Sequence, residues 1–345
     1  MPKFSDQAPL FYSFIIPAFN RPDEIYELLD SFTKLQAPKA NFEGFEVIIA
    51  DGSPTAILAE HIQKFESKLR VQHLHRPKLA ISPSRNLGAE HANGEYLIFL
   101  DSDVILPPAY MVTVHDALQK EKIDAFGGPD AAHESFTNVQ KAISFAMTSY
   151  FTTGGIRGGA KQIHQYNPRG FNMGIRKKVF EQAGGFSSFA AGEDIELSIR
   201  MISQGSVVKL IPEAFVYHKR RTNFKSFFRQ VFRFGAARIN IFYRHRDQLK
   251  ITHLFPSGFL LFLIAGFASA FVSLAVFKVF LVMIGVYYAV IFVSSTIQSK
   301  SLIVGALSII ASTFQLCGYG SGLLLNAFAV FVRGKMDGME LGASK

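Results

Sequence analysis

Short apolar runs alternate with segments of helical periodicity over the first 220 residues. The runs have the length and the aromatic and β-branched character of buried strands, and four of them lie at residues 14–17, 45–50, 71–74 and 96–100. Between the runs, apolar positions recur every three or four residues, as in Ile25, Leu28 and Phe32. This alternation predicts an α/β domain with a parallel, doubly wound sheet, whose ligands bind beyond the carboxyl ends of the strands.

The pattern changes after residue 254. From Phe255 to Val332 the only charged residues are Lys278 and Lys300, and they divide the stretch into three apolar segments. Each segment is long enough to cross a hydrocarbon core of about 30 Å. We therefore expect a transmembrane region over residues 254–333, with spans at residues 255–277, 279–298 and 302–332. A polar tail is expected to follow at residues 334–345.

The number of crossings stays open between two alternatives. Three spans would leave the C-terminus outside, although Arg333 and Lys335 follow the last segment and positive residues favour the cytosolic side. The last segment is also long, and Gly318, Gly320 and Gly322 interrupt it. We expect three crossings, with a re-entrant or broken last segment as the alternative.

The formal net charge of +9 is concentrated in one place. Between His218 and His253 there are ten Lys or Arg and one acid, so the rest of the chain is neutral. This distribution argues against a nucleic-acid partner, whose binding site would need a basic folded domain. A basic block directly before the apolar region is typical of a cytosolic segment that contacts anionic lipids.

An amphipathic helix is predicted within this block. Phe224, Phe227, Phe228 and Val231 share one helical face, and basic residues share another. We expect residues 223–253 to form an interfacial helix and linker with the apolar face toward lipid.

The N-terminal sequence lacks the pattern of a signal peptide. Residues 1–222 are therefore expected to form a cytosolic domain at the inner face of the plasma membrane.

Two carboxylates follow the strand at residues 96–100, in the sequence Asp101-Ser102-Asp103. Mg²⁺ commonly takes one or two carboxylates and completes its shell with substrate phosphates. His218 ends another predicted strand, and either a metal-ligand role or a structural role suits it. The single cysteine, Cys317, excludes an intrachain disulfide and a cysteine-based zinc site.

Other polar residues stand at the ends of predicted elements. Asp51 closes the second strand, where a carboxylate can accept the ring N–H of a nucleobase, and Arg85 stands near the start of a helix, where anions are favoured. Glu193 and Asp194 begin a later helix and serve either as caps or as an ionised general base. The glycine-rich stretch 151–170 suits either a surface loop or a lid.

Six segments resemble the family 2 glycosyltransferases in order and spacing, over roughly residues 12–240. The segments are IIPAFNRP, VIIADGSP, SPSRNLGAEHANGEYLIFLDSD, RGFNMGIRKKVFEQAGGF, GEDIELSIRM and VYHKR. The resemblance implies a GT-A-type doubly wound mixed sheet, a nucleotide-sugar donor, Mg²⁺ or Mn²⁺, and transfer with inversion at the anomeric carbon.

The resemblance also implies roles for individual residues. Asp194 matches the catalytic base, Glu193 lies beside it on the acceptor side, and Asp101 and Asp103 match the DxD pair. His218 joins that pair as a metal ligand. The donor-binding residues implied are Pro17, Phe19, Asp51, Arg85, Asp101, Arg229 and Arg233, the last two from RQVFRFG, which resembles the QxxRW signature of processive synthases.

Two positions depart from the family pattern. Ala50 replaces an acid before Asp51, which bears on nucleotide preference, and Phe234 replaces the Trp of the QxxRW signature.

We expect an inverting enzyme that moves a sugar, preferably from a UDP-sugar, to a hydroxyl of a membrane-associated, lipid-linked glycan. The alternatives are a polyprenyl-phosphate glycosyltransferase, a processive polysaccharide synthase, a nucleotidyltransferase and a non-catalytic nucleotide-sugar sensor.

Overall fold

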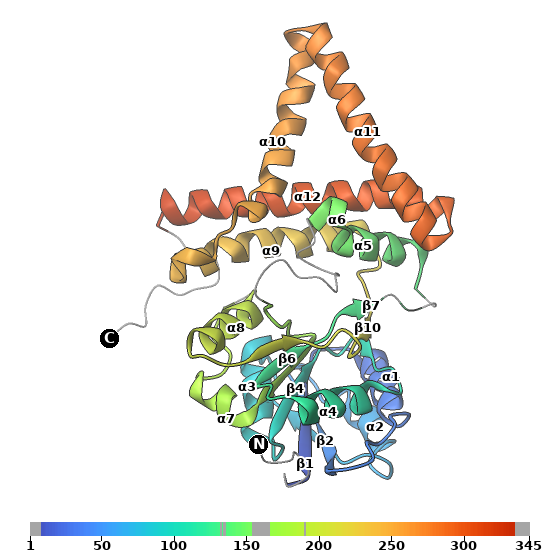
Figure 1. Cartoon of the computed structure of the whole chain (residues 1–345), viewed down its shortest axis with the longest axis vertical. Coiled ribbons are helices and arrows are strands. Elements are labelled where there is room, and N and C mark those ends of the chain that lie inside the picture. The colour runs from blue at the N-terminus through green and yellow to red at the C-terminus, as the bar shows by residue number, and fades with distance from the viewer. Residues whose placement is uncertain (1–7, 132, 134–135, 154–165, 190, 335–345) are drawn as a thin grey trace. The chain divides into compact units, whose positions relative to one another are not determined.

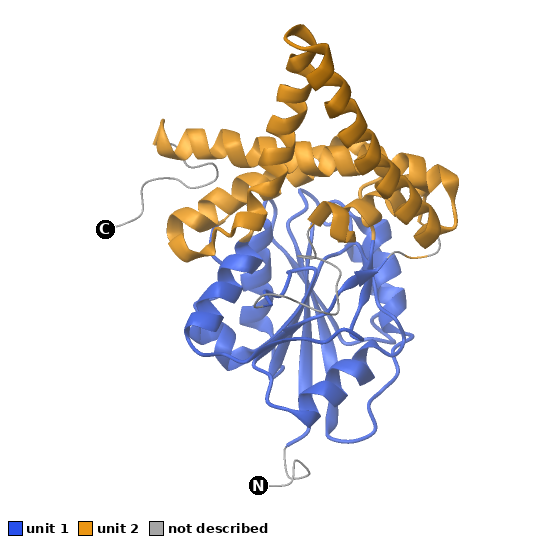
Figure 2. Cartoon of the chain, turned by 45° about the horizontal axis from the view of Figure 1, so that its top comes forward, with its two compact units in different colours: residues 1–131, 164–188, 193–218 blue, residues 132–163, 189–192, 219–345 orange. Residues whose placement is uncertain are grey.

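The computed structural model describes residues 8–131, 133, 136–153, 166–189 and 191–334 (Figure 1). The chain divides into two compact units (Figure 2). Unit 1 comprises residues 1–131, 164–188 and 193–218, and unit 2 comprises residues 132–163, 189–192 and 219–345. Most of the glycine-rich stretch, residues 154–165, lies outside the described residues, so its predicted role as loop or lid is not addressed.

Unit 1 is built on a seven-stranded mixed sheet with the order β3-β2-β1-β4-β8-β6-β9. The strands are β1 (Leu10–Ala18), β2 (Phe42–Asp51), β3 (Val71–His75), β4 (Tyr96–Leu100), β6 (Ala125–Gly127), β8 (Asn172–Arg176) and β9 (Val208–Leu210). The first four run parallel, as the alternating pattern predicted, whereas β8 is antiparallel to both β4 and β6. The mixed sheet implied by the family resemblance is therefore present.

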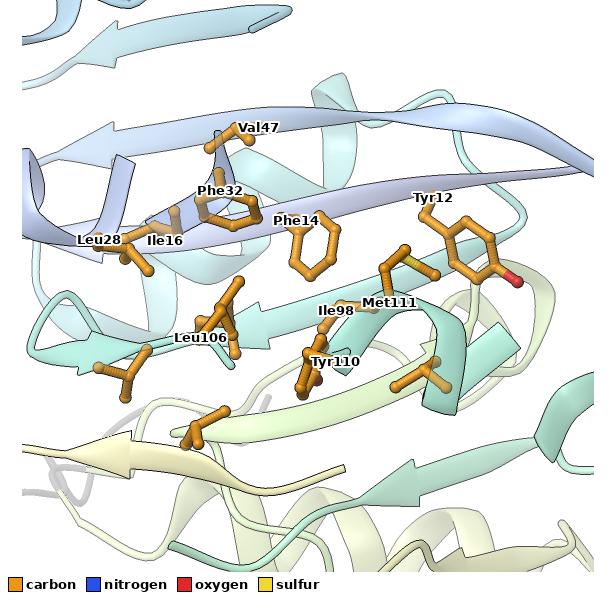
Figure 3. Packing of buried hydrophobic residues seen from close by; sticks show 14 of the residues in the cluster. Tyr12, Phe14, Ile16, Leu28, Phe32, Val47, Ile98, Leu106, Tyr110 and Met111 are labelled. Atoms are coloured by element: carbon orange, nitrogen blue, oxygen red, sulfur yellow. The ribbon is translucent and has the colours of Figure 1, made fainter. Parts of the chain in front are cut away.

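Helices cover both faces of this sheet in unit 1. They are α1 (Pro22–Phe32), α2 (Ala59–Gln63), α3 (Ile81–His91), α4 (Tyr110–Lys120), α7 (Lys177–Gln182) and α8 (Glu193–Ser203). On one face, Phe14 packs edge-on against Phe32 with their rings 4.8 Å apart, and Ile98 and Met111 lie in the same cluster (Figure 3). On the other face, Phe99 packs against Phe180 and Phe186. The core thus fixes where each strand ends.

A second, three-stranded sheet lies in unit 1. It has the order β5-β10-β7, with β5 (Val104–Ile105), β7 (Asp130–Ala131) and β10 (Val216–His218). His218 pairs with Val104, and Val216 pairs with Asp130. This small sheet brings the end of the predicted VYH strand to the residues that follow β4.

Unit 2 is helical within the described residues. Its helices are α5 (Asn138–Thr148), α6 (Tyr150–Thr153), α9 (Phe224–Arg244), α10 (Phe255–Ala268), the 3-10 turn η4 (Ser269–Phe271), α11 (Leu274–Ser299) and α12 (Leu302–Phe331). Helix α12 runs beside α9, and α10 and α11 form a hairpin that rises from α12 (Figure 1). Helices α11 and α12 are long and apolar enough to cross a membrane, and the segment Phe255–Phe271 is shorter.

Two boundaries predicted in the apolar region are wrong. The first helix ends at η4 and α11 begins at Leu274, so Lys278 lies inside α11 and does not mark a break. Gly318, Gly320 and Gly322 do not interrupt the last segment, because α12 is one helix of 30 residues. The break at Lys300 is correct, and this residue has a left-handed backbone with φ of 53°.

The apolar face of α9 also differs from the expectation. Phe227 and Val231 are fully buried and cluster with residues of α5 and α12, so this side of the helix meets protein and not lipid. The basic residues Lys225, Arg229 and Arg233 are exposed on another face, as predicted. The placement of α9 at a membrane surface stays a prediction.

Candidate functional site

Three predicted metal ligands meet beyond the carboxyl end of β4. Asp101 follows the strand directly, Asp103 precedes β5, and His218 ends β10 beside it. One ligand atom from each of the three residues lies within 4.8 Å of the others. Two carboxylates and one imidazole suit Mg²⁺ or Mn²⁺, which leave coordination positions for phosphate oxygens.

Asp103 has a close polar partner at each of its two carboxylate oxygens. One carboxylate oxygen lies 3.2 Å from His218 Nε2, and the other accepts a hydrogen bond of 2.6 Å from Arg21 Nη1. Burial alone would raise the pKa of Asp103, but the charges and hydrogen bonds of His218 and Arg21 outweigh it, so the pKa lies well below the usual range. Asp103 is therefore ionised at any physiological pH.

His218 is held on two sides by residues that the sequence did not single out. The Phe171 ring stacks on the imidazole with 4.9 Å between ring centroids. His218 Nδ1 lies 3.8 Å from an Asp130 carboxylate oxygen. At this distance Asp130 acts on the imidazole through its charge, and metal ligation through Nε2 would require that nitrogen to give up its proton.

Arg85 joins the metal-ligand cluster to the start of α8. Nη2 donates to Asp101 at 2.8 Å, and Nη1 donates to Glu193 at 2.7 Å. Burial would lower the pKa of Arg85, but the negative charges of Asp101 and Glu193 raise it, so the guanidinium stays charged. The side chain is only 2% exposed, which makes it a buried link between two acids. The direct donor contact predicted for Arg85 stays a prediction.

Glu193 and Asp194 differ in environment although they are adjacent. Glu193 is buried against Arg85, and burial, followed by the charge of Asp194, raises its pKa. The acceptor-side role predicted for Glu193 stays a prediction. Asp194 is partly exposed and accepts a hydrogen bond of 3.0 Å from the Gly170 backbone N–H. Of the two acids, Asp194 is the more exposed.

The carboxyl ends of β1 and β2 supply the predicted donor side. Pro17 is buried in the sheet and paired with Ala50, whereas Phe19 is 52% exposed. Asp51 is fully buried and accepts hydrogen bonds from the Ser53 backbone N–H at 2.8 Å and from His73 Nε2 at 3.1 Å. Asp51 therefore shapes the turn after β2, and its contact with a nucleobase stays a prediction.

The remaining predicted site residues lie elsewhere. Arg229 and Arg233 belong to α9 in unit 2, and their assignment to the donor stays a prediction. The sequence reasoning also missed Arg21, Phe171 and Asp130. Arg21 stands in the segment IIPAFNRP and Phe171 in RGFNMG, so their place in quoted motifs was an available signal. Asp130 had none, because only the pairing of β7 with β10 brings it to His218.

The site has two sides with different chemistry, a cation-binding side and an acidic side. One side can bind a divalent cation and the anionic oxygens attached to it, with Arg21 close by. The other side presents a partly exposed acid, Asp194, in the first turn of α8. A buried guanidinium fixes the distance between the two. Such a site suits displacement of a phosphate-linked group by a substrate hydroxyl.

Comparison with known proteins points the same way. Residues 13–184 match the model of the glycosyl transferase family 2. The chain is 24% identical over 266 residues to a dolichyl N-acetyl-alpha-D-glucosaminyl phosphate 3-beta-D-2,3-diacetamido-2,3-dideoxy-beta-D-glucuronosyltransferase of Methanococcus voltae, covering 74% of this chain and 80% of that protein. It is 23% identical to glycosyltransferase AglE of Haloferax volcanii, covering 70% and 77% respectively.

A solved structure shares the fold over most of the chain. The mannosyltransferase PcManGT from Pyrobaculum calidifontis, in complex with GDP-Man and Mn²⁺, superposes with a TM-score of 0.62. The two chains are 16% identical, and the match covers 89% of this chain and 88% of that one. At this identity the likeness concerns the fold.

Proposed function

Since this chain carries a glycosyl transferase family 2 domain and is a glycosyltransferase with the GT-A fold, we propose that it moves a sugar, with inversion, from a nucleotide-sugar donor to a hydroxyl of a lipid-linked glycan. A UDP-sugar is the preferred donor in this proposal. The observation that carries it is the pairing of a metal-ligand cluster, Asp101, Asp103 and His218, with an accessible acid, Asp194.

Asp101, Asp103 and His218 would hold Mg²⁺ or Mn²⁺, whose positive charge would stabilise the departing diphosphate. Two features of the chain fit such an ion: the ligand atoms converge, and Asp103 is ionised. Arg21 lies at Asp103 and adds positive charge on the donor side. The fold neighbour that contains GDP-Man and Mn²⁺ supports this choice of donor class and ion.

Asp194 acts as the general base in this reaction. Its carboxylate takes the proton of the acceptor hydroxyl while the hydroxyl oxygen forms a bond to the anomeric carbon. The bond between that carbon and the diphosphate oxygen breaks, and the electron pair leaves with the diphosphate. The Gly170 N–H orients the Asp194 carboxylate, and Arg85 holds the neighbouring Glu193 out of the reaction.

The acceptor proposal rests on the need for a base. A phosphate acceptor is already anionic at neutral pH, whereas a sugar hydroxyl needs proton removal. The relative from Methanococcus voltae, by its name, acts on a dolichyl-linked sugar phosphate, which supports a lipid-linked glycan. The long apolar helices α11 and α12 support a location at the inner membrane with the catalytic unit in the cytosol, where a lipid-linked acceptor is available.

The substitution Asp194→Asn tests the proposal. It retains the size and hydrogen-bonding oxygen of the side chain but cannot take up a proton. We expect kcat with the lipid-linked acceptor to fall by about 10²- to 10⁴-fold, while affinity for the nucleotide stays within about twofold because the metal-ligand cluster is intact.

Glu60→Gln is a matched control, since Glu60 is an exposed acid in the first turn of α2 and should leave kcat unchanged. Transfer by Asp194→Asn at near wild-type rate would refute the general-base assignment. Efficient transfer to polyprenyl phosphate by the purified wild-type protein would refute the hydroxyl acceptor.

A further inference from the structure

The hairpin of α10 and α11 exposes apolar side chains along its length. Phe271 and Val272 at the tip are 93% and 87% exposed. Below the tip, exposed apolar residues point outward from both helices; they include Leu261, Ile264, Phe267, Val276, Val282 and Val293. An exposed apolar surface of this extent needs a partner, and hydrocarbon is the partner that matches side chains without hydrogen-bonding groups.

Two lysines near the ends of α11 define the length of the apolar stretch between them. Lys278 lies one turn into α11, and Lys300 ends the helix, so they are 22 residues apart and about 33 Å apart along a helix. A hydrocarbon core is about 30 Å thick, and lysine side chains extend from its edges into the headgroups. The lysines thus stand where the two surfaces of a bilayer would meet α11. The segment Phe255–Phe271 is 17 residues long, at the lower limit for a crossing.

The C-terminal half of α12 packs closely against α9. An added side chain at Gly322 would meet the backbone oxygen of Phe232 at 2.0 Å, and one at Gly235 would meet that of Tyr319 at the same distance. Further along, Asn326 donates to the Ala236 carbonyl at 2.7 Å. Gly318 and Gly322, on which the alternative of a broken last segment rested, instead let α12 and α9 approach closely and run parallel, whereas Gly320 lies against Pro256 of α10.

This pairing bears on whether α12 can cross a bilayer. Helix α9 carries the exposed charges Lys225, Arg229 and Arg233. Because the C-terminal half of α12 is packed against α9, a crossing α12 would draw these charges into hydrocarbon, where charged side chains are strongly disfavoured. A position of both helices along the membrane surface avoids this cost and lets the exposed Leu325 and Phe328 of α12 contact the acyl chains.

We propose that the α10–α11 hairpin crosses the bilayer twice and that α12 lies in the near surface together with α9. The chain then makes two crossings and not three. Its C-terminus stays on the same side as the start of α9, which directly follows the last strand of unit 1. Arg333 after α12 then lies on the cytosolic side, in agreement with the distribution of positive residues in membrane proteins. This inference does not depend on the donor or the acceptor.

Cysteine labelling of whole cells tests the topology in a Cys317→Ala background, which removes the single native thiol. Val272→Cys reports on the tip of the hairpin, Lys345→Cys on the C-terminus, and Gln298→Cys on the base of α11 as an exposed control on the same helix. A thiol reagent that cannot cross the cytoplasmic membrane is added before and after permeabilisation. Each variant must retain sugar transfer, and a carbonate wash must leave it in the membrane.

We expect Val272→Cys to react in intact cells, and Gln298→Cys and Lys345→Cys to react only after permeabilisation. Reaction of Lys345→Cys in intact cells would establish a third crossing and overturn the proposal. Protection of Val272→Cys in intact cells, with reaction in detergent, would show that the hairpin does not reach the far side. Release of the protein by carbonate would overturn insertion altogether.

Discussion

At the scale of single residues, three carboxylates of the site pair with two guanidinium groups. Arg21 pairs with Asp103, and Arg85 pairs with Asp101 and Glu193. The fourth acid, Asp194, instead accepts hydrogen bonds from the backbone N–H groups of Gly170 and Ile195. Removing one partner of a buried ion pair leaves an uncompensated charge, so each of these contacts is expected to matter for stability as well as for binding.

The low pKa of Asp103 gives a prediction about stability in the absence of metal. A carboxyl whose pKa is lower in the folded state stabilises the fold above the unfolded pKa of about 3.9, and this contribution is lost as the pH falls below that value. At pH 7, Asp103→Asn should lower Tm by about 2 to 8 °C, from a loss of about 1–2 kcal/mol at roughly 2–4 °C per kcal/mol.

The difference in Tm between Asp103→Asn and wild type should shrink below about pH 4, as measured by thermal melting in EDTA. Asp30→Asn is the matched control, because Asp30 is also paired, with Lys34, but is exposed and should change Tm little. An equal loss of Tm at pH 7 and pH 3 would show that the charge of Asp103 does not stabilise the fold.

Most of the residues at the site could be predicted from motifs, but their contacts could not. Asp101 and Asp103 follow a recognisable buried strand, and parallel strands place their ends at one edge. The role of Arg85 as a buried link needed the three-dimensional arrangement, since Glu193 lies 108 residues away in sequence. The same holds for Asp130 and Phe171, which reach His218 only through the folded sheets.

At the scale of elements, the parallel strands β1 to β4 were predictable because each is a short apolar run. The boundaries in the apolar region were not, because hydropathy alone does not separate a helix end from a charge within a helix. Lys278 sits inside α11, and the break falls at Val272 and Ser273 instead. The glycines of α12 left a broken segment open as an alternative, because their packing against α9 and α10 is a tertiary feature that the sequence does not show.

Close packing of α12 on α9 predicts a large effect from one methyl group. Gly322→Ala would place its Cβ 2.0 Å from the Phe232 carbonyl oxygen, so the helices must separate. Overpacking of this kind costs about 1–3 kcal/mol. In Gly285→Ala the added Cβ of α11 meets nothing within 4 Å, which makes it the control. Thermal melting in detergent should show a lower Tm for Gly322→Ala alone, and equal Tm values would contradict the described α9–α12 contact.

At the scale of the whole molecule, the chain joins a catalytic unit to a helical unit that carries the long apolar helices. The connection between β10 and α9 is short, so in the proposed topology the chain tethers the catalytic unit to the membrane by only a few residues. An acceptor attached to a lipid is confined to the same surface. The central claim is therefore the chemistry of the bond formed: a glycosidic bond to a sugar hydroxyl of a lipid-linked glycan.

The most direct test identifies that bond. Purified protein in lipid vesicles is supplied with a labelled UDP-sugar, Mn²⁺ and lipid-linked glycans from native membranes, and the labelled lipid product is treated with mild acid, which cleaves sugar–phosphate bonds before glycosidic ones. We predict that the label is released within an oligosaccharide, with the anomeric configuration inverted relative to the donor. Release of the label as a free monosaccharide would show a bond to lipid phosphate and would contradict the account.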